Sequence, residues 1–274
     1  MLIKDLSDST FDQILDCFFL AFENYFVPLP KDRNYFKTRW QAAGVELDCS
    51  YGMFDEDRLV GFILHAVDTR FGFKTAFNTG TGVLPSYRGQ KITQRIYQFA
   101  LRDLIRKGFE KSTLEVITKN KVAIKVYQSV GFTIEKNFKC FKGDIKVADP
   151  GQWRLVTKPL EDVSWEDLPH QKLYSWDNQP QSLLAGPYQA HYVHHQDNTE
   201  SYFVLDQAQK YLAQFDVLTP HHQAWDRLFA AIHSQSPYLR VNNIEQKLGA
   251  KIDRLTQFGL DNHIDQYEME LTLG

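Results

Sequence analysis

The chain has few cysteines and no long apolar run. Its three cysteines, Cys17, Cys49 and Cys140, lie far apart and match no disulfide or metal-binding spacing. No apolar stretch approaches the ~18 residues that a membrane-spanning helix needs, and the N-terminus lacks the basic-then-apolar pattern of a signal peptide. These absences predict a protein of a reducing, cytoplasmic compartment with no membrane partner.

An excess of charge of one sign is also missing. The 31 basic and 34 acidic residues give a formal net charge of -3, which offers no reason to propose a nucleic-acid partner. Apolar and aromatic side chains are plentiful, with 43% hydrophobic residues that include 20 Phe, 13 Tyr and 5 Trp. The 274 residues are therefore enough for one large folded domain or two of ordinary size.

Residues 81–93, Thr-Gly-Val-Leu-Pro-Ser-Tyr-Arg-Gly-Gln-Lys-Ile-Thr, predict a strand that leads into a helix through a glycine turn. The strand, residues 74–84, breaks at Pro85. A helix N-terminus presents free backbone N–H groups and the positive end of a dipole, so it can bind phosphate or pyrophosphate. Arg88 and Lys91 add positive charge, and the segment predicts a phosphorylated ligand.

The other elements of the first half follow from apolar periodicity and from breaks at proline and glycine. They predict an α/β fold, a mixed sheet flanked by helices. Helices are predicted over 10–24, 32–43, from the Arg88-Gly89 turn to about Lys107, and over 122–130; strands are predicted at 2–3, 49–55, 58–67, 74–84, 112–117 and after Gly131.

A second informative stretch runs from Leu114 to Phe132. Glu115 lies in an apolar strand, and Asn120 follows at the strand-to-helix junction, where its amide can cap the helix or bond a ligand. Ala123 and Tyr127 lie one helical turn apart on the same face.

Together, the two stretches closely resemble the Gcn5-related N-acetyltransferases (GNAT) over roughly residues 1–145. The family's pyrophosphate loop reads Gln/Arg-x-x-Gly-x-Gly/Ala. Arg88 matches its first position, while Lys91 and Thr93 stand where the family has Gly and Gly/Ala. Main-chain N–H donors survive any substitution except proline. The family pattern Asn-x-x-Ala-x-x-x-Tyr-x-x-x-Gly-Phe is complete in Asn120, Ala123, Tyr127, Gly131 and Phe132.

The resemblance implies an acyl-CoA N-acyltransferase fold and transfer of acetyl from acetyl-CoA to a primary amine, with no metal. A protonated amine must lose a proton before it attacks a thioester, and Glu115 is the candidate base; Tyr127 is the candidate acid for the leaving thiolate. A backbone N–H of Val83 or Leu84 would face the thioester oxygen. The implied acetyl-CoA site comprises Val83, Leu84, Arg88, Gly89, Gln90, Lys91, Ile92, Thr93 and Asn120.

In the family, the loop between the first two helices borders the acceptor groove. Glu23, Tyr25 and Phe26 are therefore candidate acceptor contacts, although packing in the core and loop is an alternative for the aromatic residues. The acceptor, a small-molecule or peptide amine, and the oligomeric state stay open. The histidine-rich run favours no metal site, because only His191 and His195 share a strand face and zinc needs three or four ligands.

Residues 148–274 faintly repeat the first half. Residues 217–220, Val-Leu-Thr-Pro, precede a predicted helix over 222–233, as Val83-Leu-Pro85 precedes the earlier helix. Residues 258–260, Phe-Gly-Leu, resemble Val130-Gly-Phe132, and a closing strand is predicted over 265–273.

We therefore predict a catalytic domain over 1–147 and a degenerate copy over 148–274 that shapes the acceptor site. In this alignment Leu255 replaces Tyr127, and Arg240 falls opposite Glu115. An unrelated C-terminal domain is the alternative. For the whole chain, a non-catalytic acyl-CoA sensor or interaction module and a structural protein that keeps only the fold are the competing functions.

Overall fold

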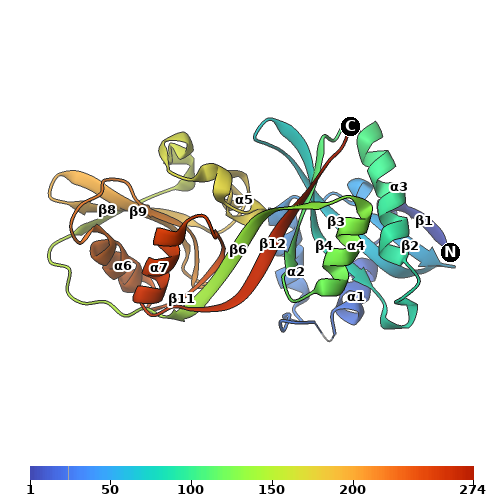
Figure 1. The fold of residues 1–274 in the computed structure, drawn as a ribbon, viewed down its shortest axis with the longest axis horizontal. Helices are drawn as coiled ribbons and strands as arrows, with labels where there is room; N and C mark the ends of the chain where they lie inside the picture. Colours follow the sequence, from blue (N-terminus) through green and yellow to red (C-terminus); the bar gives the residue numbers. More distant parts are fainter. Residues whose placement is uncertain (24) are drawn as a thin grey trace. The chain divides into compact units, whose positions relative to one another are not determined.

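The computed structural model describes residues 1–23 and 25–274. It divides the chain into two compact units: unit 1 comprises residues 1–135 and 268–274, and unit 2 comprises residues 136–267. Each unit is a sheet flanked by helices (Figure 1), which confirms the predicted mixed α/β arrangement. The boundary predicted after residue 147 falls inside unit 2, because that unit already includes most of strand β6 (Thr133–Asp144).

The sheet of unit 1 has the strand order β1-β2-β3-β4-β5-β12. The first four strands pair antiparallel, and β4 pairs parallel with β5. The strands are β1 (Leu2–Asp5), β2 (Tyr51–Asp55), β3 (Arg58–Arg70), β4 (Phe73–Val83), β5 (Lys111–Ile117) and the end of β12 (Asp261–Thr272). The helices are α1 (Phe11–Ala21), α2 (Arg33–Ala43), α3 (Ile92–Arg106) and α4 (Lys121–Val130), with 3-10 turns η1 (Leu47–Cys49) and η2 (Pro85–Tyr87).

Local sequence explains where helix α1 begins and ends. Thr10 and Gln13 form a reciprocal capping box, in which each side chain accepts the other's backbone N–H at 3.2 and 3.1 Å. The helix ends at Ala21, before the predicted end, and Asn24 lies outside the described residues.

The last strand of unit 1 comes from the end of the chain. The Leu273 N–H donates to the Glu110 carbonyl at 2.7 Å, and the Lys111 ammonium lies 2.6 Å from the Glu270 carboxylate. In Figure 1 the red end of the chain accordingly runs among the elements of unit 1. Residues 268–274 thus cover the edge of β5.

The sheet of unit 2 has the order β6-β11-β10-β9-β8-β7. Its further strands are β7 (Arg154–Lys158), β8 (Gln189–His195), β9 (Asn198–Asp206), β10 (Tyr211–Val217) and β11 (Tyr238–Glu245). Its helices are α5 (Pro180–Leu184), α6 (Ala224–Gln235) and α7 (Gly249–Gln257), with 3-10 turns η3 (Leu160–Asp162), η4 (Trp165–Asp167), η5 (Gln171–Leu173) and η6 (Trp176–Asn178). Among the described residues, no helix is both long enough and apolar enough to cross a membrane.

Unit 2 repeats the strand order of unit 1, and equivalent backbone hydrogen bonds occur within each unit. The Leu84 N–H donates to the Val60 carbonyl at 2.9 Å, and in unit 2 the Leu218 N–H donates to the Glu200 carbonyl at 2.8 Å. Both β3–β4 and β9–β10 also carry a one-residue register shift at the matching place. Strands β7–β11 therefore correspond to β1–β5, and helices α6 and α7 to α3 and α4.

The ends of α4 and α7 fix the alignment of these helices. The Phe132 N–H donates to the Tyr127 carbonyl at 3.1 Å, and the Leu260 N–H donates to the Leu255 carbonyl at 3.0 Å. Leu255 thus occupies the position of Tyr127, which confirms that prediction.

The predicted equivalence of Arg240 and Glu115 is wrong. Arg240 pairs with Tyr211 in the way that Thr113 pairs with Phe77, so Arg240 corresponds to Thr113. Strand β11 then has a register irregularity between Val241 and Ile244. A bulge adds a residue to one strand, so it shifts the alignment of β11 with β5. The pattern of apolar residues in the sequence does not reveal it.

Candidate active site

Strands β4 and β5 diverge after a short parallel stretch. They pair over Thr75–Asn78 and Lys111–Leu114, whereas β4 continues to Val83 and β5 to Ile117. Among the described residues no β4–β5 pair follows Leu114, so the two strand ends diverge, and we call the region between residues 79–83 and 115–117 the slot.

The Asn78 side chain shapes β4 where the slot begins. It accepts the Gly80 N–H at 3.0 Å and donates to the Thr81 hydroxyl at 2.7 Å and to the Tyr97 hydroxyl at 2.5 Å. Sequence reasoning missed these three polar partners. An asparagine and threonines that interrupt an apolar strand beside two glycines, Gly80 and Gly82, were the available signal.

Tyr127 joins this polar group from helix α4. Its side chain is 8% exposed, and its ring centroid lies 6.0 Å from that of Tyr97. Burial raises the pKa of Tyr127 to about 12, and hydrogen bonds with the Thr81 and Asn78 side chains oppose the rise. Tyr127 is therefore a protonated phenol at neutral pH that is held against the end of β4.

The predicted phosphate-binding turn leads directly from β4 into α3. Gly89 and Lys91 both have left-handed backbone conformations, with φ of 80° and 56°, which glycine adopts freely and lysine adopts at a cost. Helix α3 begins at Ile92, whose side chain is buried, and its first turn contains no acidic residue. Backbone N–H groups of this turn, including that of Thr93, have no partner inside the helix and suit an anion.

Arg88 connects this turn to helix α1. Its guanidinium donates to the Ala21 carbonyl at 2.9 Å and to the Val83 carbonyl at 3.3 Å. These bonds use two of its five N–H donors. Arg88 therefore braces the turn and retains donors for a ligand, while Gln90 is exposed beside it.

The backbone of β4 distinguishes between the two predicted N–H donors to a thioester. The Leu84 N–H already donates to the Val60 carbonyl on β3 at 2.9 Å. Successive residues of an antiparallel strand direct their N–H groups to opposite edges. The Val83 N–H therefore faces the other edge of β4, on the side of the slot.

Asn120 and Tyr25 meet at the start of α4. The Asn120 side chain caps the helix by accepting the Ala123 N–H at 3.2 Å. Burial raises the pKa of Tyr25, and a hydrogen bond with the Asn120 side chain opposes the rise. The Tyr25 ring also packs against Phe22 and Phe26, at 4.9 and 5.4 Å between centroids.

The remaining predicted residues lie around this centre. Glu115 follows the last β4–β5 pair, and its Oε1 atom is shielded from solvent. Glu23 is exposed, and Phe26 is 53% exposed. The structure therefore gathers Tyr25, Asn120 and Tyr127, and Glu115 lies where the slot begins.

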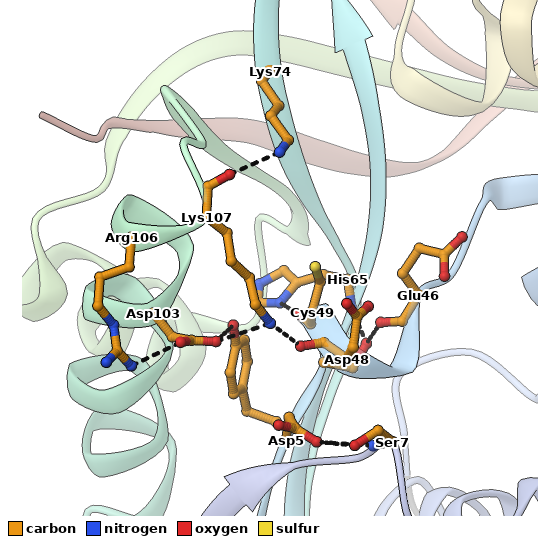
Figure 2. A network of polar contacts seen from close by, with 12 residues as sticks. Asp5, Ser7, Glu46, Asp48, Cys49, His65, Lys74, Asp103, Arg106 and Lys107 are labelled. Atoms are coloured by element: carbon orange, nitrogen blue, oxygen red, sulfur yellow. Dashed lines mark hydrogen bonds and ion pairs between the residues drawn. The ribbon is translucent and has the colours of Figure 1, made fainter.

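A separate polar network secures the other end of α3 (Figure 2). The Lys107 ammonium lies 3.0 Å from the Asp103 carboxylate and donates to the Asp48 carbonyl, and the Tyr51 hydroxyl donates to Asp103 at 2.9 Å. Beside it, Nδ1 of His65 lies 2.7 Å from the Cys49 carbonyl. The network ties α3 to β2 and η1, and so helps to fix the helix whose N-terminus forms the turn.

The histidines of β8 make local contacts. Nδ1 of His191 lies 2.9 Å from the Thr157 hydroxyl, and Nδ1 of His195 lies 3.0 Å from the Gln152 carbonyl. In the described part of the chain, no three His, Cys, Asp or Glu side chains converge as metal ligands would.

Comparison with known families matches one domain to unit 1. The acetyltransferase (GNAT) family matches residues 10–132, which include the slot, the turn and Tyr127. No curated protein matches the chain.

Solved structures resemble the whole chain in fold. A tandem GNAT protein from the clavulanic acid biosynthesis pathway has 15% identity and a TM-score of 0.68, covering 100% of this chain and 98% of that one. A GCN5-related N-acetyltransferase from Sphaerobacter thermophilus has 9% identity and a TM-score of 0.70, covering 99% and 95%. One from Kribbella flavida has 15% identity and a TM-score of 0.62, covering 99% and 71%. At these identities the likeness shows the fold alone, and it is the fold that the sequence predicts.

Proposed function

We propose that unit 1, whose residues 10–132 match the acetyltransferase (GNAT) family, transfers acetyl from acetyl-CoA to a primary amine. The observation that carries the proposal is the divergence of β4 and β5 after Leu114, with Tyr127 held against the end of β4 and helix α3 beginning shortly after that strand. A thioester arm fits the slot, and a pyrophosphate fits the helix N-terminus.

The acetyl-CoA site in this proposal uses mainly backbone groups. Gly89, Gln90, Lys91, Ile92 and Thr93 offer main-chain N–H groups to the pyrophosphate, and the charges of Lys91 and Arg88 lie beside it. Asn120 bonds the pantetheine arm, Leu84 forms an apolar wall, and the Val83 N–H faces the thioester oxygen.

The reaction is direct attack of the amine on the thioester. Glu115, directly or through a water, takes a proton from the amine, and the nitrogen forms a bond to the acetyl carbon. The Val83 N–H stabilises the resulting oxyanion. The carbon–sulfur bond then breaks, and Tyr127 protonates the thiolate. Because the pKa of Tyr127 is about 12, the phenol is ready to donate throughout the neutral range.

The acceptor amine enters beside the loop between α1 and α2 in this proposal. Tyr25 and Phe26 would line the entrance, and the exposed carboxylate of Glu23 would attract an ammonium group. Small-molecule and peptide amines both fit this chemistry.

A calorimetric titration with acetyl-CoA tests the binding step. We expect saturable binding that Arg88→Ala weakens at least ~10-fold, through lost charge and lost bracing of the turn. Arg102→Ala, at an exposed position farther along α3, is the matched control and should leave binding unchanged. Absence of binding by the wild-type protein would refute the proposal.

Release of free CoA thiol in the presence of an amine panel tests the chemistry. Acetyl-dependent release with at least one amine is expected. Tight binding without release across the panel would select the sensor or interaction module instead. That alternative is favoured by the Lys91 side chain at a position where glycine is usual in the family.

A further inference from the structure

Unit 2 has a buried lysine at the place that corresponds to the slot of unit 1. Strands β10 and β11 share one register pair within the described residues, Tyr211 with Arg240, and so diverge as β4 and β5 do. Lys251 of α7 is 3% exposed, and its ammonium lies 2.9 Å from the Asp216 carboxylate on β10. The same ammonium lies 4.8 Å from the centroid of the Phe215 ring.

These contacts place the ammonium at the open edge of β10. Consecutive residues of a strand direct their side chains to opposite faces of the sheet. A group that reaches both Phe215 and Asp216 must therefore lie beside the strand edge, between the two faces. That edge borders the gap between β10 and β11.

The lysine and the aspartate correspond to two small residues of unit 1, an alanine and a glycine. Lys251 stands eight residues before Gly259, as Ala123 stands eight residues before Gly131. Asp216 pairs with Tyr202 in the way that Gly82 pairs with Phe62.

Gly82 has no room for a side chain in unit 1. A Cβ atom there would lie 2.7 Å from the Phe62 ring and 2.8 Å from the Ala21 side chain. Gly82 is thus packed against Phe62 and Ala21, and neither Gly82 nor Ala123 has a side chain long enough to form a pair, whereas the corresponding residues of unit 2 form the buried Lys251–Asp216 pair.

A buried chain of hydrogen bonds fixes the lysine in place. Lys251 donates to the Tyr174 hydroxyl at 3.3 Å, which lies 3.4 Å from the Tyr202 hydroxyl. Tyr202 in turn donates to the Gln214 side chain at 3.2 Å. Burial alone would lower the pKa of Lys251, but Tyr174 and Asp216 outweigh it and raise the pKa. The ammonium therefore stays charged and paired.

The turn before α6 has also lost its anion-binding character. It has no glycine, and Asp226 places a carboxylate in the first turn of the helix, where it meets the positive end of the dipole. Arg227 is committed elsewhere, because its guanidinium makes two bonds to buried Glu200, at 2.7 and 2.6 Å, and one to the His222 carbonyl at 2.8 Å.

We propose that Lys251 and Asp216 form a built-in plug that closes unit 2 to acyl-CoA, so that each chain binds one molecule of acetyl-CoA. This inference rests on the proposed function of unit 1. It assigns the paired side chains as the internal occupant of the second slot, and it makes unit 1 responsible for all binding of the coenzyme.

The stoichiometry of acetyl-CoA binding to the intact chain tests the plug. One equivalent per chain by calorimetry is the expected result. Two equivalents would overturn the plug and leave the function of unit 1 standing. No binding at all would overturn the function proposed for unit 1, so the two failures are distinguishable.

The reactivity of Lys251 gives a second readout that needs no catalysis. We expect a trideuteroacetyl N-hydroxysuccinimide ester to label Lys251 at least ~10-fold more slowly than exposed Lys247, because the plugged amine is buried and paired. Saturating acetyl-CoA should leave both rates unchanged. Rapid labelling of Lys251, or labelling that increases with acetyl-CoA, would show that the lysine leaves the slot and would overturn the proposal.

Discussion

Units 1 and 2 share a strand order, a bulge and helix-terminal hydrogen bonds, yet differ at the few positions where a ligand would touch them. Gly82, Ala123 and Tyr127 of unit 1 are replaced by Asp216, Lys251 and Leu255. The fold thus persists across these exchanges, because most of the hydrophobic cluster of unit 2 is formed by residues at other positions, and Leu255 keeps its position apolar.

The helix entries show which features belong to the fold. Lys91 before α3 and Gln223 before α6 both have left-handed conformations, with φ of 56° and 62°. Neither is glycine, although this conformation costs an L-residue roughly 1–2 kcal/mol. Unit 2 keeps the left-handed residue before its helix although the first turn of that helix is acidic. The left-handed conformation therefore directs the chain from the strand into the helix and does not indicate ligand binding.

Ala123→Lys should give the largest effect, because it transfers the lysine of unit 2 into unit 1. We expect loss of acetyl-CoA binding by at least ~100-fold, since the side chain would enter the slot and could not find an equivalent of Asp216. Val122→Lys adds the same charge at a neighbouring position that is 77% exposed, and it is the control. Calorimetry on both variants measures the binding of acetyl-CoA. Equal binding by the two variants would contradict the equivalence of Ala123 and Lys251.

Acid should affect the two units alike, because each buries a neutral histidine. Burial lowers the pKa of His65 and of His191 to about 4, whereas an unfolded histidine titrates near 6.5. The unfolded chain therefore binds more protons, and stability that is present above about pH 6.5 is lost as the pH falls toward 4. The shifted pKa of each histidine should lower the free energy of unfolding by about 2 kcal/mol between pH 7 and pH 5.

Urea denaturation at the two pH values measures this loss. His65→Asn keeps a donor near the Cys49 carbonyl and removes the titrating ring, so it should reduce the acid loss. Exposed His222→Asn should not. An identical acid dependence in His65→Asn and the wild type would exclude His65 as a source.

Tyr127→Phe removes the hydroxyl of unit 1, which Leu255, the equivalent residue of unit 2, also lacks. Turnover should fall at least ~10-fold while acetyl-CoA binding barely changes, because the phenol acts on the leaving thiolate. In the wild type, this acid should impose no loss of kcat between pH 8 and 10, because its pKa is about 12. Steady-state kinetics with titration of binding decide the matter, and an unchanged rate would remove Tyr127 as the acid.

Gln94→Asp should have the smallest effect, as it transfers the acidic first turn of α6 to α3. The carboxylate stabilises the helix but repels phosphate, and binding of acetyl-CoA should weaken about 5-fold at low salt. Gln94→Asn is the neutral control. The difference between the variants should shrink in 0.5 M salt, about where screening shortens to a few ångströms; a difference that persists would mean that the effect is steric.

Features with a short-range sequence signal could be predicted. The helix and the strand that flank the turn were expected within a residue or two of their observed bounds, and the Tyr127–Leu255 equivalence held because both helices end at a glycine in the same way. Periodicity and capping act within a few residues, so one sequence carries them.

Features that join distant segments could not be predicted. The bond of the Leu84 N–H to β3, the clustering of Asn78 with Tyr97, and the plug between Asp216 and Lys251 all depend on how strands and helices come together. A lysine on a helix with an amphipathic pattern reads as a solvated residue, and only its position beside the splayed strands reveals its burial.

The strand that completes unit 1 has a consequence for synthesis of the chain. Unit 2 is continuous in sequence, whereas the edge of β5 in unit 1 waits for residues 268–274. At translation rates of about 5–20 residues per second, that wait lasts on the order of 10 s. During that interval the nascent unit 1 presents an unpaired strand edge, which invites association with other chains. Unit 2, residues 136–267, is therefore synthesised completely before residues 268–274 can cover the edge of β5 in unit 1.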